Sequence, residues 1–337
     1  MPSVSGEVPR NSTARWLVPA LGYAISAGCL VWVYWGFDWK GELPKLAAVG
    51  WRWTALAVAA ELATYCCQGW RWSLLLRPIA PPQFLRSVQS IFIGLFANSV
   101  LPFRSGEVIR AYVQALWLDI PFMLCFSSAL IERLLDGLLL VGGFYVVTLV
   151  VPVPGPLRDA GLVLAILVGA SSVLMGIVMF HKHHAHAAIS KSRWAEGLWH
   201  VVEGLHAMGN SRWFYLSGAA SVLYLVSQLI PIYALTRGSG LDLPLGALAV
   251  VLIILRLGTV LPQAPSNLGG FQFFTVLGLR LFGVDKATAA SFATILFIVT
   301  TAPLWLGGAI ATALAGTGIK DLHHHAHASL RRPQARS

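Results

Sequence analysis

The chain has 337 residues, of which 56% are apolar and 11% charged, and its formal net charge is +10. This composition lies far outside that of soluble proteins, so it predicts an all-α polytopic membrane protein and leaves no stretch for a separate nucleotide-using domain. The basic residues are spread over short loops rather than gathered on one face, which argues against nucleic acid as a partner.

The first half begins with a polar tail over residues 1–15 and an apolar run too long and bulky for a signal peptide. The spans expected there cover about 16–36, 52–70, 121–150 and 161–180. Between the second and third of them, the apolar segment 84–118 is interrupted at Pro102 and Gly106. Residues 106–118 are too short to cross a core of ~30 Å, so a re-entrant hairpin is predicted.

The second half repeats this order after a basic loop at 181–212, in which apolar residues at helical spacing predict a surface helix. A span over about 213–236 precedes a second broken apolar segment at 243–282, which is interrupted at Pro262. A last span, about 286–316, is followed by a polar tail at 317–337. We therefore expect one transmembrane domain over 16–316, with halves at 16–180 and 213–316.

The two broken segments indicate an internal repeat, since both contain Leu-Pro at the break, 160 residues apart from Pro102 to Pro262. Three full spans separate the hairpins, so the hairpins must enter from opposite faces. About six full spans and two re-entrant hairpins in an inverted repeat are typical of transporters whose site lies near the midplane.

The distribution of Lys and Arg predicts the orientation. Thirteen fall on the side of the N-terminus, seven on the other side and four inside the membrane zone. Cytoplasmic loops carry the excess of positive charge, so both termini are expected in the cytoplasm, in a bacterial inner membrane.

Three charges in the third span, Glu132, Arg133 and Asp136, are the first candidates for function. Unpaired charge at that depth costs ~2.5–3.5 kcal/mol per residue, so these groups are expected to be paired. The two carboxylates share a helix face and are expected to meet Arg104 or Arg110 at the first hairpin. The alternative is a purely structural ion-pair network.

Arg104 and Arg110 are the expected contacts of an anionic head group, because guanidinium binds phosphate oxygens in a bidentate manner. Glu107 either joins them or forms a local salt bridge, and Arg256 either faces the site or extends outward. Free N–H groups at the start of each return helix suit an anion. The remaining candidates are the amides Asn98, Asn267 and Gln272, with Gln263, and the hairpin backbone residues Pro102, Gly106, Pro262, Pro265, Gly269 and Gly270.

No catalytic triad, nucleotide-binding loop or metal-ligand spacing is present in the sequence, so no catalytic residue, cofactor or metal is expected. Histidines cluster in two polar regions, and a solvated His-rich tract explains them better than a metal site does. They are His181, His183, His184 and His186, and His323, His324, His325 and His327.

Three segments together resemble the lysylphosphatidylglycerol synthase transmembrane-region family, the flippase-like integral membrane proteins. They are 98–110, 132–136 and 261–272, and the resemblance extends over about 15–316. It implies a membrane domain that moves a lipid, in a stand-alone member without the aminoacyl-transferase domain. Gln272 stands where the second hairpin of the family usually ends in Glu. This chain therefore lacks the charge that a mechanism with a charge pair in the second half would need.

The leading hypothesis is a lipid flippase that passes a polar or anionic head group through a charged midplane cavity. The lipid would be a phospholipid, a hopanoid or a polyprenyl-linked lipid, and transport would be passive or ion-linked, with Glu132 or Asp136 as proton carriers. The alternatives are a membrane-embedded transferase acting on a lipid carrier and a non-transporting accessory protein of lipid biosynthesis. A homo-oligomer or a lipid-biosynthesis partner is also compatible with the sequence.

Overall fold

Helices account for nearly all of the structure, a computed structural model that describes residues 14–47, 49–101, 105–149, 151, 155–180, 195–258 and 263–316. The first half comprises α1 (Ala14–Tyr34), α2 (Trp39–Ala47), α3 (Trp51–Leu76), α4 (Phe84–Val100), α5 (Gly106–Leu118), α6 (Phe122–Thr148) and α7 (Gly155–Phe180). The second comprises α9 (Ala195–Gly209), α10 (Arg212–Ser227), α11 (Leu229–Gly238), α12 (Leu245–Gly258), a 3-10 turn η2 (Pro265–Asn267), α13 (Gly270–Arg280) and α14 (Lys286–Leu314).

The helices lie where apolar periodicity predicts them, with two differences. The polar segment after α1, expected to be a loop, forms α2, because Glu42 turns into the bundle and accepts a hydrogen bond from the Ser291 hydroxyl at 2.7 Å. The expected fifth span is broken at Gln228 into α10 and α11, with Pro231 in the first turn of α11.

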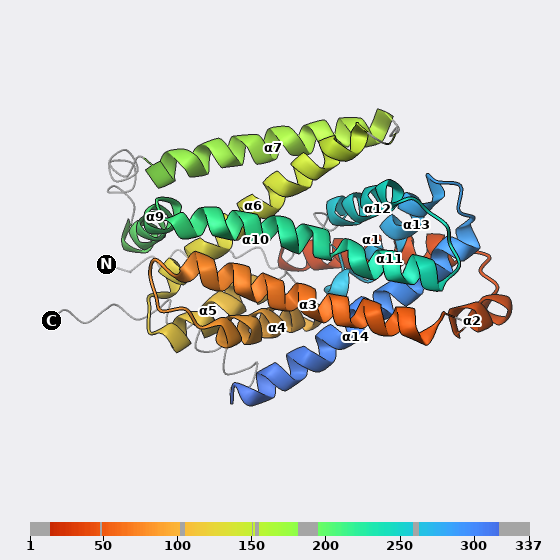
Figure 1. The fold of residues 1–337 in the computed structure, drawn as a ribbon, viewed down its shortest axis with the longest axis horizontal. Coiled ribbons are helices and arrows are strands. Elements are labelled where there is room, and N and C mark those ends of the chain that lie inside the picture. The colour runs from red at the N-terminus through yellow and green to blue at the C-terminus, as the bar shows by residue number, and fades with distance from the viewer. Residues whose placement is uncertain are drawn as a thin grey trace, which may run out of the picture.

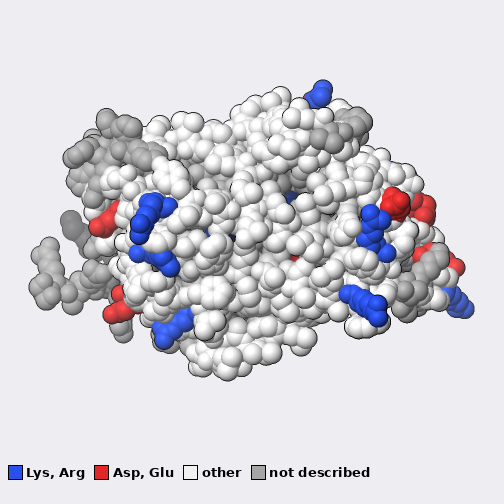
Figure 2. Space-filling view, in the orientation of Figure 1, with Lys and Arg blue, Asp and Glu red and all other residues white. Residues whose placement is uncertain are grey.

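Charge is distributed along the long axis as a bilayer requires. Lys and Arg side chains gather toward the two ends of the face shown in Figure 2, and the wide band between them shows little charge. Among the described residues, Arg212–Gly238 and Lys286–Leu314 are long and apolar enough to cross a bilayer by length and composition alone. The number of helices that cross remains a prediction.

Two helical hairpins are too short to run the length of the bundle. At 1.5 Å per residue, α4 is about 25 Å long and α5 about 20 Å. Helices α4 and α5 lie toward one end of the molecule and α12 and α13 toward the other (Figure 1). Their tips meet, because the Ser266 hydroxyl of η2 donates to the Ser99 carbonyl of α4 at 3.3 Å. The hairpins therefore approach each other from opposite ends, as an inverted repeat predicts.

Helix packing repeats between the halves. The first arm of each hairpin packs against the long helix that follows the other hairpin, α4 against α14 and α12 against α6. The surface helices are also equivalent, since α2 packs on α14 and α9 on α6. The bundle is thus built from two interlocked copies of one arrangement.

The register of the repeat differs from the sequence-based expectation. Gly106 and Gly270 begin the return helices, and Phe122 and Lys286 begin the helices that follow, an offset of 164 residues in both cases. The Leu-Pro pairs, 160 residues apart, are therefore four residues out of step with the helix starts. Pro102 and Pro262 themselves lie outside the described residues.

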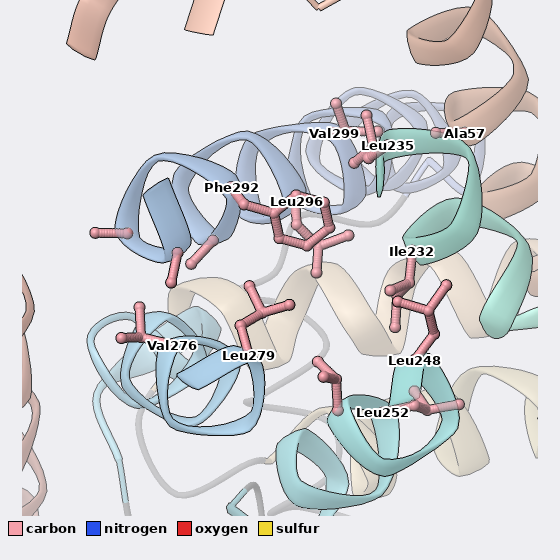
Figure 3. Packing of buried hydrophobic residues seen from close by; sticks show 14 of the residues in the cluster. Ala57, Ile232, Leu235, Leu248, Leu252, Val276, Leu279, Phe292, Leu296 and Val299 are labelled. Atoms are coloured by element: carbon pink, nitrogen blue, oxygen red, sulfur yellow. The ribbon is translucent and has the colours of Figure 1, made fainter. Parts of the chain in front are cut away.

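The largest apolar core lies mainly in the second half, where α11, α12, α13 and α14 meet. Leu235, Leu248, Leu279 and Leu296 are fully buried there and point toward one another (Figure 3). This part of the molecule is held by close packing rather than by charge.

The first hairpin closes on glycine. A methyl group at Gly106 would lie 1.9 Å from the carbonyl oxygen of Gly94. We therefore expect Gly106→Ala to force the two arms apart and to lower the free energy of unfolding by about 1–3 kcal/mol. Thermal unfolding in detergent, followed by tryptophan fluorescence, measures this.

Gly142→Ala is the matched control, because a methyl group at this helical glycine meets no atom within 4 Å. Its melting temperature should stay the same or rise slightly, since alanine favours helix. Equal melting temperatures for the two variants would contradict the close approach of the arms.

Candidate functional site

A network of six charged side chains joins α3, α5 and α6. At its centre, the Glu132 carboxylate is fully buried and accepts from Arg71 Nη2 at 2.5 Å, while its other oxygen lies 2.5 Å from Arg110 Nη2. Arg71 also donates to Asp136. Arg110 is held in turn by Glu107, with Nε donating to a carboxylate oxygen at 2.8 Å. Three arginines thus balance three carboxylates once Arg133 is included.

Arg133 forms the exposed edge of this network. Its side chain is 50% exposed, and its guanidinium lies 3.3 Å from Asp136 and 3.7 Å from Glu107. These two carboxylates are partly exposed, at 25% and 29%, whereas Arg71 and Glu132 are fully buried. The network therefore has a buried structural part and an edge that a ligand can reach.

The edge lies deep along the helices. Arg133 is eleven residues into α6 and Glu107 eleven residues from the end of α5, so each is about 17 Å from the same end of the bundle. That is about half of a ~30 Å hydrocarbon core, where charge is costly and usually functional.

Local geometry explains how each charge is placed. Gly94 lets the Arg110 stem pass close to α4, since a methyl group there would lie 2.8 Å from the Arg110 Cβ. The guanidinium of Arg110 faces the Trp72 ring, 4.7 Å from its centroid, and Trp72 Nε1 donates to Ser128 at 2.8 Å. The side chains are thus fixed by packing as well as by ion pairs.

Of the nine predicted site residues, five meet in this network, three lie elsewhere and one lies outside the described residues. Glu107, Arg110, Glu132, Arg133 and Asp136 belong to it. Asn98 accepts from the Gly106 N–H at 2.8 Å, and Gln272 accepts from the Gly269 N–H at 2.8 Å, so both amides cap return helices. Asn267 lies in η2 at the second tip, and Arg104 lies outside the described residues.

Of the predicted hairpin backbone residues, those in the second hairpin form an irregular tip. Pro265 begins η2, and the chain then takes positive φ at Ser266 (59°), Asn267 (55°) and Gly269 (88°). Gly269 also lies against the backbone of α1, where a methyl group would be 2.3 Å from the Ser26 carbonyl oxygen. A methyl group at Gly270 would likewise lie 2.2 Å from the Gln263 side-chain oxygen.

Arg71 is the site residue that sequence reasoning missed. It is one of the thirteen basic residues expected on the side of the N-terminus, but it is fully buried and bound to two carboxylates. Removing it from the cytoplasmic side leaves twelve basic residues there against seven. A signal for it existed, because Glu61, Thr64, Gln68 and Arg71 recur at helical spacing on one face of α3.

The internal repeat shows that the network belongs to one half only. At an offset of 164, Glu107 corresponds to Phe271 and Arg133 to Phe297, and these two rings contact each other with centroids 5.5 Å apart. Arg110 corresponds to Phe274, which lies against Gly258 as Arg110 lies against Gly94. Glu132 corresponds to the buried Leu296. The same geometry is therefore charged in the first half and apolar in the second.

No group of three or more His, Cys, Asp or Glu side chains suited to a metal ion occurs among the residues described. The two histidine clusters, at 181–186 and 323–327, lie outside them.

An all-helical bundle with two opposed hairpins and a charge network buried beside the first of them defines a multi-pass membrane protein. More narrowly, the chain belongs to the family described as the lysylphosphatidylglycerol synthase TM region, which matches residues 20–308. The chain is therefore a membrane protein of a family whose function concerns membrane lipids. The resemblance expected from the three motifs is confirmed.

A more distant similarity links the chain to the protein named glycosyltransferase AglD of Haloferax volcanii. The two are 26% identical over 259 residues, a match that covers 65% of this chain and 42% of that protein. The chain thus spans less than half of this relative. No solved structure matches the chain significantly.

Proposed function

We propose that this protein moves a lipid with a polar or anionic head group between the leaflets of a bacterial inner membrane. The observation that carries the proposal is the half-exposed Arg133, held about halfway through the bundle by a network whose centre is buried. A head-group phosphate loses its hydrogen bonds to water when it enters the membrane. A guanidinium at that depth replaces them with two parallel N–H groups.

The head group would contact Arg133 while its acyl tails stay in the bilayer. A phosphate oxygen would replace Glu107 as a partner of Arg133, because that 3.7 Å contact is the longest in the network. Arg71 and Arg110 would act differently, holding Glu132 in place rather than touching lipid. Movement of the first hairpin against α6 would then change the leaflet to which the edge opens.

The experiment compares lipid scrambling in proteoliposomes containing wild-type protein and Arg133→Met. We expect the rate to fall at least tenfold, because a charge-assisted hydrogen bond contributes about 1.5–3 kcal/mol. Arg237→Met is the matched control, since Arg237 pairs with Asp242 at 2.9 Å near the end of the bundle. Equal rates for all three proteins would refute this assignment of Arg133.

The orientation belongs to the same proposal. The excess of twelve basic residues over seven favours cytoplasmic termini. The C-terminal end of α5 and the N-terminal end of α6 would then lie on the cytoplasmic side. A lipid from the cytoplasmic leaflet would reach the exposed edge from these ends.

A transferase acting on a lipid carrier is the second candidate, favoured by the name of the Haloferax volcanii relative, a glycosyltransferase. The purified protein would then convert a labelled sugar donor and a polyprenyl phosphate into a glycolipid. Scrambling without product formation would support transport instead.

A further inference from the structure

A second polar cluster lies in the other half of the molecule, around Arg256 of α12. Its guanidinium contacts the side-chain oxygen of Gln228, where α10 breaks into α11. Gln228 Nε2 donates in turn to the Tyr224 carbonyl at 3.1 Å, and Glu61 of α3 interacts electrostatically with Arg256. Arg256 therefore faces the interior of the bundle rather than extending outward.

Tyr224 connects this cluster to the network of the first half. Its ring faces the Arg71 guanidinium, 4.6 Å from the centroid, and Arg71 is bound to Asp136, the partner of Arg133. Tyr224 lies one helical turn from Gln228, the residue that Arg256 contacts. Helices α6 and α12, which carry the two arginines, pack against each other. Tyr224 thus lies between guanidinium groups from opposite halves.

Exposure separates the residues that a ligand can reach from those that only support them. Arg71, Glu132, Ser217 and Ser221 are fully buried in this region. Arg133, Tyr224 and Arg256 are partly exposed. Two guanidinium groups and a phenol hydroxyl are the donors that phosphate oxygens accept from, and arginine binds them with two parallel N–H groups.

The internal repeat adds an independent argument. At the offset of 164, Arg133 of the first half corresponds to Phe297, and Arg256 of the second corresponds to Phe92. Each half therefore contributes one arginine at a position where the other half has phenylalanine. Because the two arginines are not equivalent by the repeat, the site they form is composite and occurs once.

We infer that Arg256 and Tyr224 complete the site that begins at Arg133, so that one phosphate group is held between the two halves of the chain. The inference rests on the proposed function and extends it by naming the ligand chemistry, a phosphate monoester or diester, and a second guanidinium. A phosphate that bridges Arg133 and Arg256 links α6 to the second hairpin. Its binding therefore depends on how these two elements lie relative to each other.

The experiment measures binding to the purified full chain in detergent, with dihexanoyl phosphatidic acid and inorganic phosphate as separate probes. For wild-type protein we expect the short-chain lipid to bind and inorganic phosphate to bind more weakly. Arg256→Met should weaken lipid binding about tenfold, as expected for one lost charged contact, and Tyr224→Phe by a smaller factor. Arg237→Met should bind like wild type.

Each result has a consequence. Unchanged lipid affinity in Arg256→Met and Tyr224→Phe overturns the composite site, and a preference for inorganic phosphate overturns a lipid as its ligand. Tyr224→Phe and Arg256→Lys keep the test valid if Arg256→Met does not fold. Loss of binding in these variants, in a protein that scrambles no lipid, would uphold the site while refuting transport. Slowed scrambling in Arg133→Met with normal binding in Arg256→Met would refute the composite site alone.

Discussion

Replacing Glu132 by glutamine is expected to destabilise the protein by about 3–5 kcal/mol, because it leaves two buried guanidinium groups without their shared counter-charge. Glu132 is fully buried between Arg71 and Arg110, which are themselves buried. The neutral amide keeps the shape of the carboxylate but cannot balance either charge. Unfolding of the purified protein by denaturant in mixed micelles measures the change.

Glu203→Gln makes the same chemical change on α9, where the carboxylate is half exposed and lies 3.6 Å from His200. We expect it to cost less than about 1 kcal/mol, since exposed ion pairs contribute little. A Glu132→Gln variant as stable as Glu203→Gln would show that the central ion pairs do not hold the hairpin to α3 and α6.

The geometry also bears on the sequence-based expectation that Glu132 or Asp136 carries a proton. Each of these carboxylates is paired with two arginines. Glu132 is fully buried, whereas Asp136 is partly exposed. Of the two, Asp136 is therefore the carboxylate that water or a ligand can reach.

The architecture was largely readable from the sequence, because bilayer physics constrains it strongly. Apolar run length located the helices, and a break at Pro102 or Pro262 within a short apolar segment predicted a hairpin. Helix α2 was missed because its sequence is polar, and it is held by the contact of Glu42 with Ser291, a residue far away in the chain. Contacts of that kind leave no periodic signal.

The site was only partly readable. Charge in an apolar span identified Glu132 and Asp136. An arginine between two tryptophans, as Arg71 is, is also typical of a helix end in the head-group region, and only the polar face of α3 indicated that Arg71 is buried. Tyr224 was also invisible, because its role depends on which helix packs opposite α3. Arg71 and its partner Glu132 are 61 residues apart in the chain.

The apolar half provides a sharper test of why the charges are there. At the offset of 164, Arg71, Arg110 and Glu132 correspond to Leu235, Phe274 and Leu296. We expect the triple variant Arg71→Leu, Arg110→Phe, Glu132→Leu to fold and to be more stable than Glu132→Gln. The buried ion triad is replaced whole by apolar residues, a change that often costs little, and Glu107 and Asp136 keep Arg133 as a partner. Its lipid scrambling should fall to the level of empty liposomes.

The expected loss of transport follows from the geometry of the exposed edge. Without Arg71, Asp136 loses its buried partner, and without Arg110, Glu107 loses the contact that fixes it beside Arg133. The guanidinium of Arg133 would then no longer be held at mid-depth. The comparison with Glu132→Gln separates the two roles, since the single change removes stability and the triple change removes function from a folded protein. A triple variant that folds and scrambles lipid normally would mean that the ion pairs serve only to hold the helices together.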